Sequence, residues 1–271
     1  MTFEQPPYRI RECERCGLLY RDCTLSAEEF ARYYSLVPAQ KWAIAGYYPT
    51  EAAILARLKA LPPRRRILDF GCSSGRLLSS LTATHECHGI EINEEAAHAA
   101  AKKGLHMLGL EDLVAKAAWF DAIILADVFE HLSAPVALLR QLVSALKPTG
   151  ALMIVTGNGD APACRRDPAQ FWYFREIEHI CMFTRRHADF LAGELNLEMH
   201  EWTELCHYDL SLREKLVQQL QNFAYWQFRE QTALARGFLN FLPLFSRLRQ
   251  GDVAPTYSCS PDHVLAVFRK R

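Results

Sequence analysis

The segment ILDFGCSSG, residues 67–75, combines an acidic residue with two glycines. Asp69 follows an apolar pair, and Gly71 and Gly75 stand four positions apart with only small residues between them. Glycine permits a tight turn and the close approach of a ligand, and the first N–H groups of a helix have no partner within that helix. The spacing therefore predicts a turn that binds a small ligand through its backbone.

Two common phosphate-binding turns do not match this segment. A dinucleotide fingerprint would have glycine at positions 71, 73 and 76, but this chain has Ser73 and Arg76. A P-loop would have a Gly-Lys-Ser/Thr ending, which the segment lacks. These differences argue against a nicotinamide or flavin cofactor and against a P-loop.

The turn belongs to a repeated alternation of strands and helices. Short apolar runs are followed by stretches with helical apolar spacing, and Asn93 and Gly104 mark the start and stop of one helix. Strands that are apolar throughout indicate a parallel sheet covered on both faces. We also expect KPTG, 147–150, to end a helix, and Asp209 to cap one. The expected strands are 67–70, 86–92, 105–108, 120–129, 151–156, 196–202 and 262–270.

Four motifs in series resemble those of class I S-adenosylmethionine-dependent methyltransferases, in particular the bacterial small-molecule group related to ubiquinone-pathway enzymes. They are ILDFGCSSG, GIEIN, FDAIILADVFEHL and LKPTG, and the resemblance covers roughly residues 50–203. It implies an α/β, Rossmann-like, doubly wound and mostly parallel seven-stranded sheet with an antiparallel hairpin at its edge. It also implies S-adenosyl-L-methionine as cofactor and a small-molecule acceptor, such as a sugar, a lipid-linked compound or a natural-product intermediate.

We expect four parts along the chain. A cysteine knuckle-like and helical segment (1–50) precedes the cofactor-binding core (51–207). A helical insertion (208–252) then comes before the last strand of the core sheet (253–271). The insertion is expected to pack on the core or on a second copy of the chain, which would make a homodimer. The alternatives are a cover for a bulky apolar substrate and a membrane-surface contact, of which the second is not favoured.

The resemblance assigns roles around the cofactor residue by residue. The glycine turn would hold its amino acid part, and Glu91 would accept hydrogen bonds from the ribose hydroxyls. Glu91 follows Gly71 by 20 residues, in agreement with the ribose acid of other doubly wound folds. Ser73 stands where the family often has glycine. The assigned residues are Asp69, Gly71, Cys72, Gly75, Glu91, Ile92, Leu110, Glu111, Ala126 and Asp127.

Methyl transfer to a hydroxyl or carbon acceptor requires a base. His131, just past the fourth expected strand, and His179, in the loop region after the fifth, are the candidates. His131 has an alternative role in positioning its loop. Related ubiquinone-pathway enzymes have a divalent metal linked to acidic and histidine residues at this rim. The corresponding positions are Asp127, Glu130 and His131, where we do not expect a metal.

The N-terminal cysteines are a second candidate site. Cys13 and Cys16 have the spacing of a zinc knuckle, with Gly17 allowing the turn. Cys23 would supply a third ligand, but the second cysteine pair of such modules is missing. The sequence therefore leaves open whether these cysteines bind zinc.

Composition limits the remaining classes of function. The 271 residues include 31 Lys+Arg and 31 Asp+Glu, so no long-range field favours nucleic acid. Nine cysteines spread along the chain predict reduced thiols without structural disulfides. No signal segment or apolar membrane span is evident, which predicts a cytoplasmic protein. Two functional alternatives are aminopropyl transfer and a catalytically silent, cofactor-binding scaffold or regulatory protein.

Overall fold

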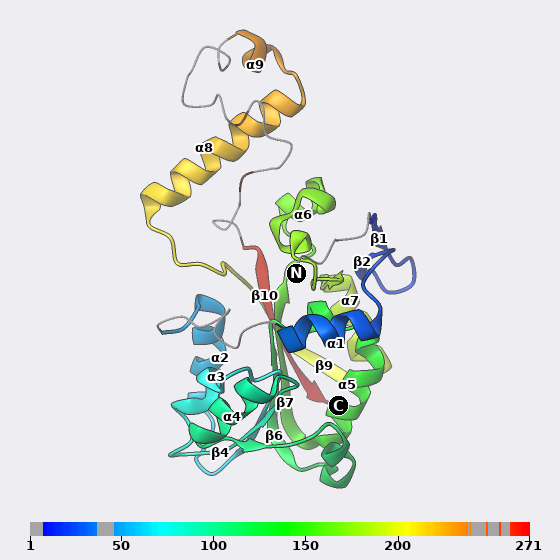
Figure 1. The fold of residues 1–271 in the computed structure, drawn as a ribbon, viewed down its shortest axis with the longest axis vertical. Coiled ribbons are helices and arrows are strands. Elements are labelled where there is room, and N and C mark those ends of the chain that lie inside the picture. Colours follow the sequence, from blue (N-terminus) through cyan, green and yellow to red (C-terminus); the bar gives the residue numbers. More distant parts are fainter. Residues whose placement is uncertain (1–7, 37–45, 238, 240–247, 249–254, 256–260) are drawn as a thin grey trace.

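A central seven-stranded sheet organises the chain, as seen in a computed structural model that describes residues 8–36, 46–237, 239, 248, 255 and 261–271 (Figure 1). The spatial order is β5-β4-β3-β6-β7-β10-β9. Strand β10 runs opposite to the other six, which all point the same way. The predicted fold class is confirmed. The strands are β3 (Arg66–Phe70), β4 (Glu86–Ile90), β5 (His106–Met107), β6 (Phe120–Ala126), β7 (Leu146–Gly157), β9 (Leu197–Leu205) and β10 (His263–Lys270).

Successive residues of the central strands face two different cores. Leu68 and Ile123 contribute to the core under α5 and α7, and Ile67 and Ile124 contribute to the core under α2, α3 and α4. Burial on both faces explains why the strands read as continuous apolar runs. The covering helices are α2 (Pro49–Lys59), α3 (Arg76–Ser79), α4 (Glu94–Lys102), α5 (Pro135–Ala145) and α7 (Arg185–Glu194).

Two local predictions were wrong. The segment 147–150 does not end a helix, because β7 already begins at Leu146, whose buried side chain lies opposite Phe120 of β6. Asp209 does not cap the insertion helix α8 (Leu212–Arg229). Ser211 and Glu214 form a capping box there instead, and this reciprocal pair satisfies two backbone N–H groups where a lone aspartate would satisfy one.

The N-terminal cysteines lie in a β-hairpin. β1 (Ile10–Glu12) pairs with β2 (Leu19–Arg21), which pairs in turn with β8 (Cys181–Met182) to form a separate three-stranded sheet. Gly17 adopts the left-handed φ of +74° in the turn. Within the described ranges, no cluster of three metal-ligand side chains includes a cysteine, so zinc binding by Cys13, Cys16 and Cys23 is not supported. The cysteines of those ranges are free thiols.

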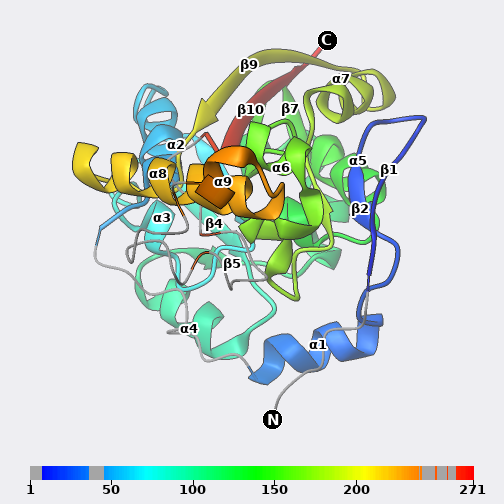
Figure 2. The same cartoon turned by 90° about the horizontal axis from the view of Figure 1, so that it is seen from above.

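Helix α8 projects away from the sheet (Figure 1), and it lies over the core when the molecule is seen from above (Figure 2). α8 exposes an apolar row, and the apolar segment 237–251 that follows lies mostly outside the described residues. No helix in the described part of the chain combines the length and apolar character that crossing a membrane requires. The remaining helices are α1 (Ala27–Leu36), η1 (Glu111–Lys116), η2 (Phe129–His131), α6 (Pro162–Arg166), η3 (Pro168–Gln170), η4 (Trp172–Arg175) and α9 (Ala233–Gly237).

A buried arginine fastens the hairpin to the loop that follows β7. Arg21, 5% exposed, donates to the backbone carbonyls of Phe174, Glu176 (2.7 Å) and Ile177 (3.2 Å). A planar guanidinium can serve several acceptors at once from one fixed position. The segment 174–177 therefore depends on a residue of the N-terminal hairpin.

Replacing Arg21 tests this dependence. Arg21→Met removes the donors but keeps much of the apolar stem, so it leaves three carbonyls without this donor. We expect a loss of about 2–3 kcal/mol in the free energy of unfolding, measured by urea denaturation. Arg11→Met, at an exposed pair with Asp22, is the matched control and should change little. Equal free energies of unfolding for the two variants would show that the hydrogen bonds of Arg21 do not stabilise the fold.

Candidate active site

The carboxyl ends of three adjacent parallel strands form one edge of the sheet. Phe70 of β3 lies in register with Ile90 of β4 and Leu125 of β6. The next residue or two along each strand therefore lie at the same edge. Ligands bind at such an edge in doubly wound sheets. The predicted cofactor residues Gly71, Glu91, Ala126 and Asp127 are brought together there.

The glycine turn requires its glycines. Gly71 has a φ of +77°, and a Cβ there would lie 2.5 Å from Cγ2 of Val128. Its N–H and that of Cys72 both donate to the carbonyl of Ile90, at 2.8 and 3.1 Å. The Cys72 side chain packs over Gly89, where a Cβ would lie 2.5 Å from the thiol sulfur. Burial raises the pKa of this thiol, so Cys72 has a packing role in addition to its place in the turn.

Glu91 is held by the backbone on both sides. Its Oε2 accepts from the N–H of Ser73 and its Oε1 from that of Asn93, each at 2.8 Å. Asn93 caps α4, as predicted, by accepting from the N–H of Ala96. The two apolar residues predicted to contact adenine are exposed to solvent: Ile92 is 71% and Leu110 is 41% exposed. Glu111 lies at the start of η1.

A short chain of polar groups lies next to Asp127. The hydroxyl of Tyr173 is 3.2 Å from Oδ1 of Asp127 and also contacts Oε1 of Glu130. Thr156 donates to the other Glu130 oxygen at 2.7 Å. Glu130 is completely buried, and burial raises its pKa despite the neighbouring His131. Asp127 has a left-handed φ of +52°, a strained conformation of the kind that clusters at functional sites.

The two predicted base candidates lie side by side, with ring centroids 5.0 Å apart. Nδ1 of His131 is 3.0 Å from the carbonyl of Glu178, and Nδ1 of His179 is 2.5 Å from that of Tyr173. Burial, followed by the neighbouring His131, holds the pKa of His179 well below its usual value. His179 is therefore neutral at physiological pH. Glu130, His131 and His179 also form one of the two clusters in the described chain whose donor atoms lie within 4.8 Å of one another.

Several site residues were missed by the sequence analysis. Tyr34 of α1 places its ring 6.0 Å from that of His131, and its carbonyl accepts from Asn93 at 3.4 Å. His207 lies two residues after β9, Asp262 directly precedes β10 and His263 begins it, so the two sides of the insertion meet at the same edge. The helical spacing that marks the insertion lies within it, whereas these residues flank it and belong to no motif.

Comparison with known proteins identifies the core. A family model described as a methyltransferase domain matches residues 44–202, more than half of the chain. The chain belongs to this methyltransferase family. A ubiquinone biosynthesis O-methyltransferase of Xanthomonas axonopodis pv. citri is 32% identical to this methyltransferase over 128 residues, which cover 44% of this chain and 50% of that enzyme. A protein of the same name from Xylella fastidiosa is 35% identical over 104 residues, with coverages of 34% and 42%. The chain spans half or less of the length of these curated relatives.

Solved structures support the same fold. The geranyl diphosphate C-methyltransferase of Streptomyces coelicolor A3(2), solved with Mg²⁺, geranyl diphosphate and S-adenosyl-L-homocysteine, has a TM-score of 0.57 at 13% identity, covering 92% of this chain and 100% of that one. The [4+2]-cyclase SpnF has a TM-score of 0.55 at 16% identity, with coverages of 92% and 97%. At these identities the similarity concerns the fold, which is the class I Rossmann-like one.

The glycine turn of this methyltransferase is surrounded by carboxylates. Burial, reinforced by the charges of Glu51 and Glu91, raises the pKa of Asp69 to about 7. Glu51 is itself paired with Arg76, with Oε2 at 2.7 Å from Nη1. A ligand that brings positive charge to this position would relieve the repulsion around Asp69. The turn is therefore electrostatically suited to a cationic ligand.

The raised pKa of Asp69 gives a stability prediction. The folded carboxyl holds its proton to higher pH than the unfolded one. The contribution of Asp69 to the free energy of unfolding is therefore fully present below about pH 4 and is lost as pH rises to about 7. Asp69→Asn should remove this loss and make the ligand-free protein more stable than wild type at pH 8, by at most about 4 kcal/mol.

Denaturation of both proteins from pH 4 to pH 8 checks this expectation. The exposed Glu94→Gln variant should follow wild type across the range. A constant difference between Asp69→Asn and wild type at every pH would contradict the raised pKa.

Proposed function

We propose that this chain transfers a methyl group from S-adenosyl-L-methionine to a hydroxyl group of a small molecule. The observation that carries the proposal is the adjacency of two environments at one sheet edge. A carboxylate-rich glycine turn suits a cationic ligand, and Asp127 joins it to the buried Glu130–Tyr173 pair and the two histidines. A scaffold that only bound the cofactor would have no need of a buried acid–base network.

The residues at the turn fit this cofactor. When bound, S-adenosyl-L-methionine supplies a methyl group already activated on a sulfonium centre. Asp69, with its raised pKa, favours a positively charged amino acid moiety at the glycine turn. Glu91 presents a fixed carboxylate for ribose hydroxyls, and the exposed Ile92 and Leu110 offer apolar surface to the adenine. A structural neighbour solved with S-adenosyl-L-homocysteine supports the same assignment.

His131 is the better candidate for the base. A carbonyl oxygen can only accept, so the contact with Glu178 places the His131 proton on Nδ1 and leaves Nε2 with a lone pair. The His131 side chain is 19% exposed, whereas that of His179 is 11% exposed and is covered by Tyr173, with ring centroids 4.0 Å apart. We therefore assign proton removal to His131 Nε2 and positioning of the loop to His179.

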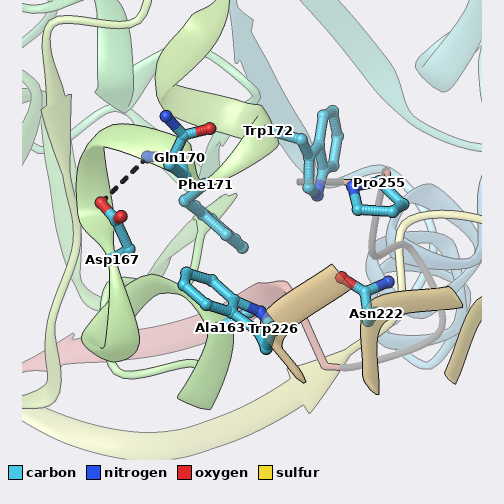
Figure 3. A pocket seen from close by; sticks show the side chains of 8 residues that line it. All are labelled: Ala163, Asp167, Gln170, Phe171, Trp172, Asn222, Trp226 and Pro255. Carbon is cyan, nitrogen blue, oxygen red and sulfur yellow. Dashed lines mark hydrogen bonds between the residues drawn. The ribbon is translucent and has the colours of Figure 1, made fainter. Parts of the chain in front are cut away.

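The acceptor side is aromatic. A pocket between the segment 163–172 and α8 is lined by Phe171, Trp172 and Trp226, with Asn222 at its side (Figure 3). Trp172 also donates its Nε1–H to Asp262, 3.2 Å away, so the pocket adjoins the sheet edge. We infer that the acceptor has an apolar or aromatic portion and that the insertion covers it. The names of the curated relatives support an oxygen acceptor.

Cofactor binding is the first part of the proposal to test. Glu91→Gln removes the charge but keeps the shape, so it should weaken S-adenosyl-L-homocysteine binding by about 1–3 kcal/mol, measured by isothermal titration calorimetry. Glu94→Gln, three residues away on α4, is the control and should bind as wild type does. Unchanged affinity of Glu91→Gln would contradict the ribose assignment, and no binding by folded wild type would contradict the proposed function.

Turnover tests the role of the histidines. Labelled methyl transfer to a panel of phenols, sugars and polyprenyl alcohols should identify an acceptor. With that acceptor, His131→Gln should lower kcat by about 100- to 10,000-fold while leaving S-adenosyl-L-homocysteine affinity intact. His179→Gln should have a smaller effect on kcat. Equal kcat for wild type and His131→Gln would exclude His131 as the base. Cofactor binding without transfer to any member of the panel would favour the silent-scaffold alternative.

A further inference from the structure

We propose that Asp127, His207 and His263 bind a divalent transition-metal ion at the acceptor side of the site. The donor atoms of these three side chains all lie within 4.8 Å of one another. They come from three separate places in the chain: the end of β6, the segment after β9 and the first residue of β10. Of the rim residues linked to a metal in related enzymes, only Asp127 belongs to this set.

The orientation of His263 is the central observation. Its Nδ1 lies 3.0 Å from Oδ1 of Asp262, and a carboxylate can only accept, so this nitrogen carries a proton. In the neutral ring Nε2 then carries a lone pair, and this nitrogen lies 3.5 Å from Oδ1 of Asp127. Two acceptors facing each other repel unless a cation lies between them.

The distance between these two atoms suits an ion better than a hydrogen bond. A charged N–H···O⁻ hydrogen bond is about 2.7–2.9 Å long. Two ligand atoms each about 2.1 Å from a tetrahedral ion are about 3.4 Å apart, close to the observed 3.5 Å. The donor atom of the third ligand, His207, lies within 4.8 Å of both.

Burial leaves imidazole nitrogens without partners here. His263 is completely buried and His207 is 9% exposed. Nε2 of His263 and Nδ1 of His207 have no hydrogen-bond partner within the described residues. In the neighbouring Glu130–His131–His179 cluster, by contrast, both Glu130 oxygens accept hydrogen bonds, and neither histidine has a buried nitrogen without a partner among the described residues. The orphaned nitrogens favour the first cluster as the metal site.

The surroundings of the cluster hold its ligands in place. Asp262 accepts from His263 Nδ1, from the N–H of His207 (3.0 Å) and from Trp172 Nε1 (3.2 Å). Metal-binding histidines commonly donate their second nitrogen to such a carboxylate. The His207 ring is stacked between those of Tyr48 and His263, with centroids 4.3 and 4.5 Å away. Stacking on both sides fixes the plane in which its nitrogens lie.

Two imidazoles and one carboxylate are ligands for zinc, iron or manganese, and they leave coordination positions open. The role that we infer rests on the proposed function. An acceptor hydroxyl would occupy an open position, where the ion lowers the pKa of the hydroxyl. His131 would take the released proton, and the oxygen would attack the methyl group as the methyl–sulfur bond breaks and sulfur keeps the electron pair. The site therefore selects oxygen acceptors.

The competing explanation is a proton in place of the ion. Burial alone would lower the pKa of His263, but the neighbouring carboxylates of Asp127 and Asp262 raise it to about 9. A doubly protonated His263 would also satisfy both carboxylates. The experiment must therefore distinguish an imidazolium ring from a metal-bound one.

The test titrates chelator-treated full-length protein with Zn²⁺ alone by calorimetry and with Co²⁺ by absorption spectroscopy. Cys13→Ser/Cys16→Ser protein is used in parallel, so that thiolates do not provide the ligands. We expect one ion per chain and a cobalt spectrum without thiolate charge transfer. Asp262→Asn should weaken Zn²⁺ binding about 10- to 100-fold, and His207→Asn and His263→Asn should weaken it further. His200→Asn, on the exposed side of β9, is the control.

Three results would overturn the proposal. They are the absence of stoichiometric Zn²⁺ binding, binding that survives His207→Asn, and ¹⁵N chemical shifts of a doubly protonated His263 in excess Zn²⁺. If His263→Asn does not fold, His207→Asn and Asp262→Asn still decide the matter. Because the titration uses neither cofactor nor acceptor, its failure leaves methyl transfer untouched. Failure of S-adenosyl-L-homocysteine to bind would likewise leave the metal site standing.

Discussion

Buried carboxylates constrain the whole functional edge of the sheet. A carboxyl group removed from water must be protonated, hydrogen-bonded or placed beside a cation. Each acid here meets that requirement differently. Glu130 has the hydroxyls of Tyr173 and Thr156, Asp262 has three N–H donors, and Asp69 retains its proton to higher pH. Because these partners come from separate strands and loops, the acids link elements that are distant in sequence.

Asp262 connects parts of the chain that are distant in sequence. Its carboxylate joins His207, two residues after β9, to His263 at the start of β10 and to Trp172 in the aromatic segment after β7. The insertion lies between His207 and Asp262 in the sequence, and these two residues are hydrogen-bonded to each other. Arg21 provides a comparable link, from the N-terminal hairpin to the segment 174–177. The segment 172–177 is thus contacted by residues from near both ends of the chain.

The sequence could predict the core because its signals are local. The glycine turn, the helix cap at Asn93 and the apolar strands each depend on neighbouring residues. The end of α5 and the cap of α8 were misjudged, because strand pairing at Leu146 and the capping box at Ser211 outweighed simpler local cues. The cluster around His263 could not be foreseen. It depends on the register of β10 against β7 and β9, which brings together residues with no common motif.

Glu91 shows how the site is prepared before a ligand arrives. Its carboxylate already accepts two backbone N–H groups, from the glycine turn and from the start of α4. Those contacts fix the side-chain torsions during folding, so little further rotamer entropy is lost on association. The consequence is a carboxylate whose position is fixed in advance, so that any ligand it selects is selected by rigidity and not by rearrangement.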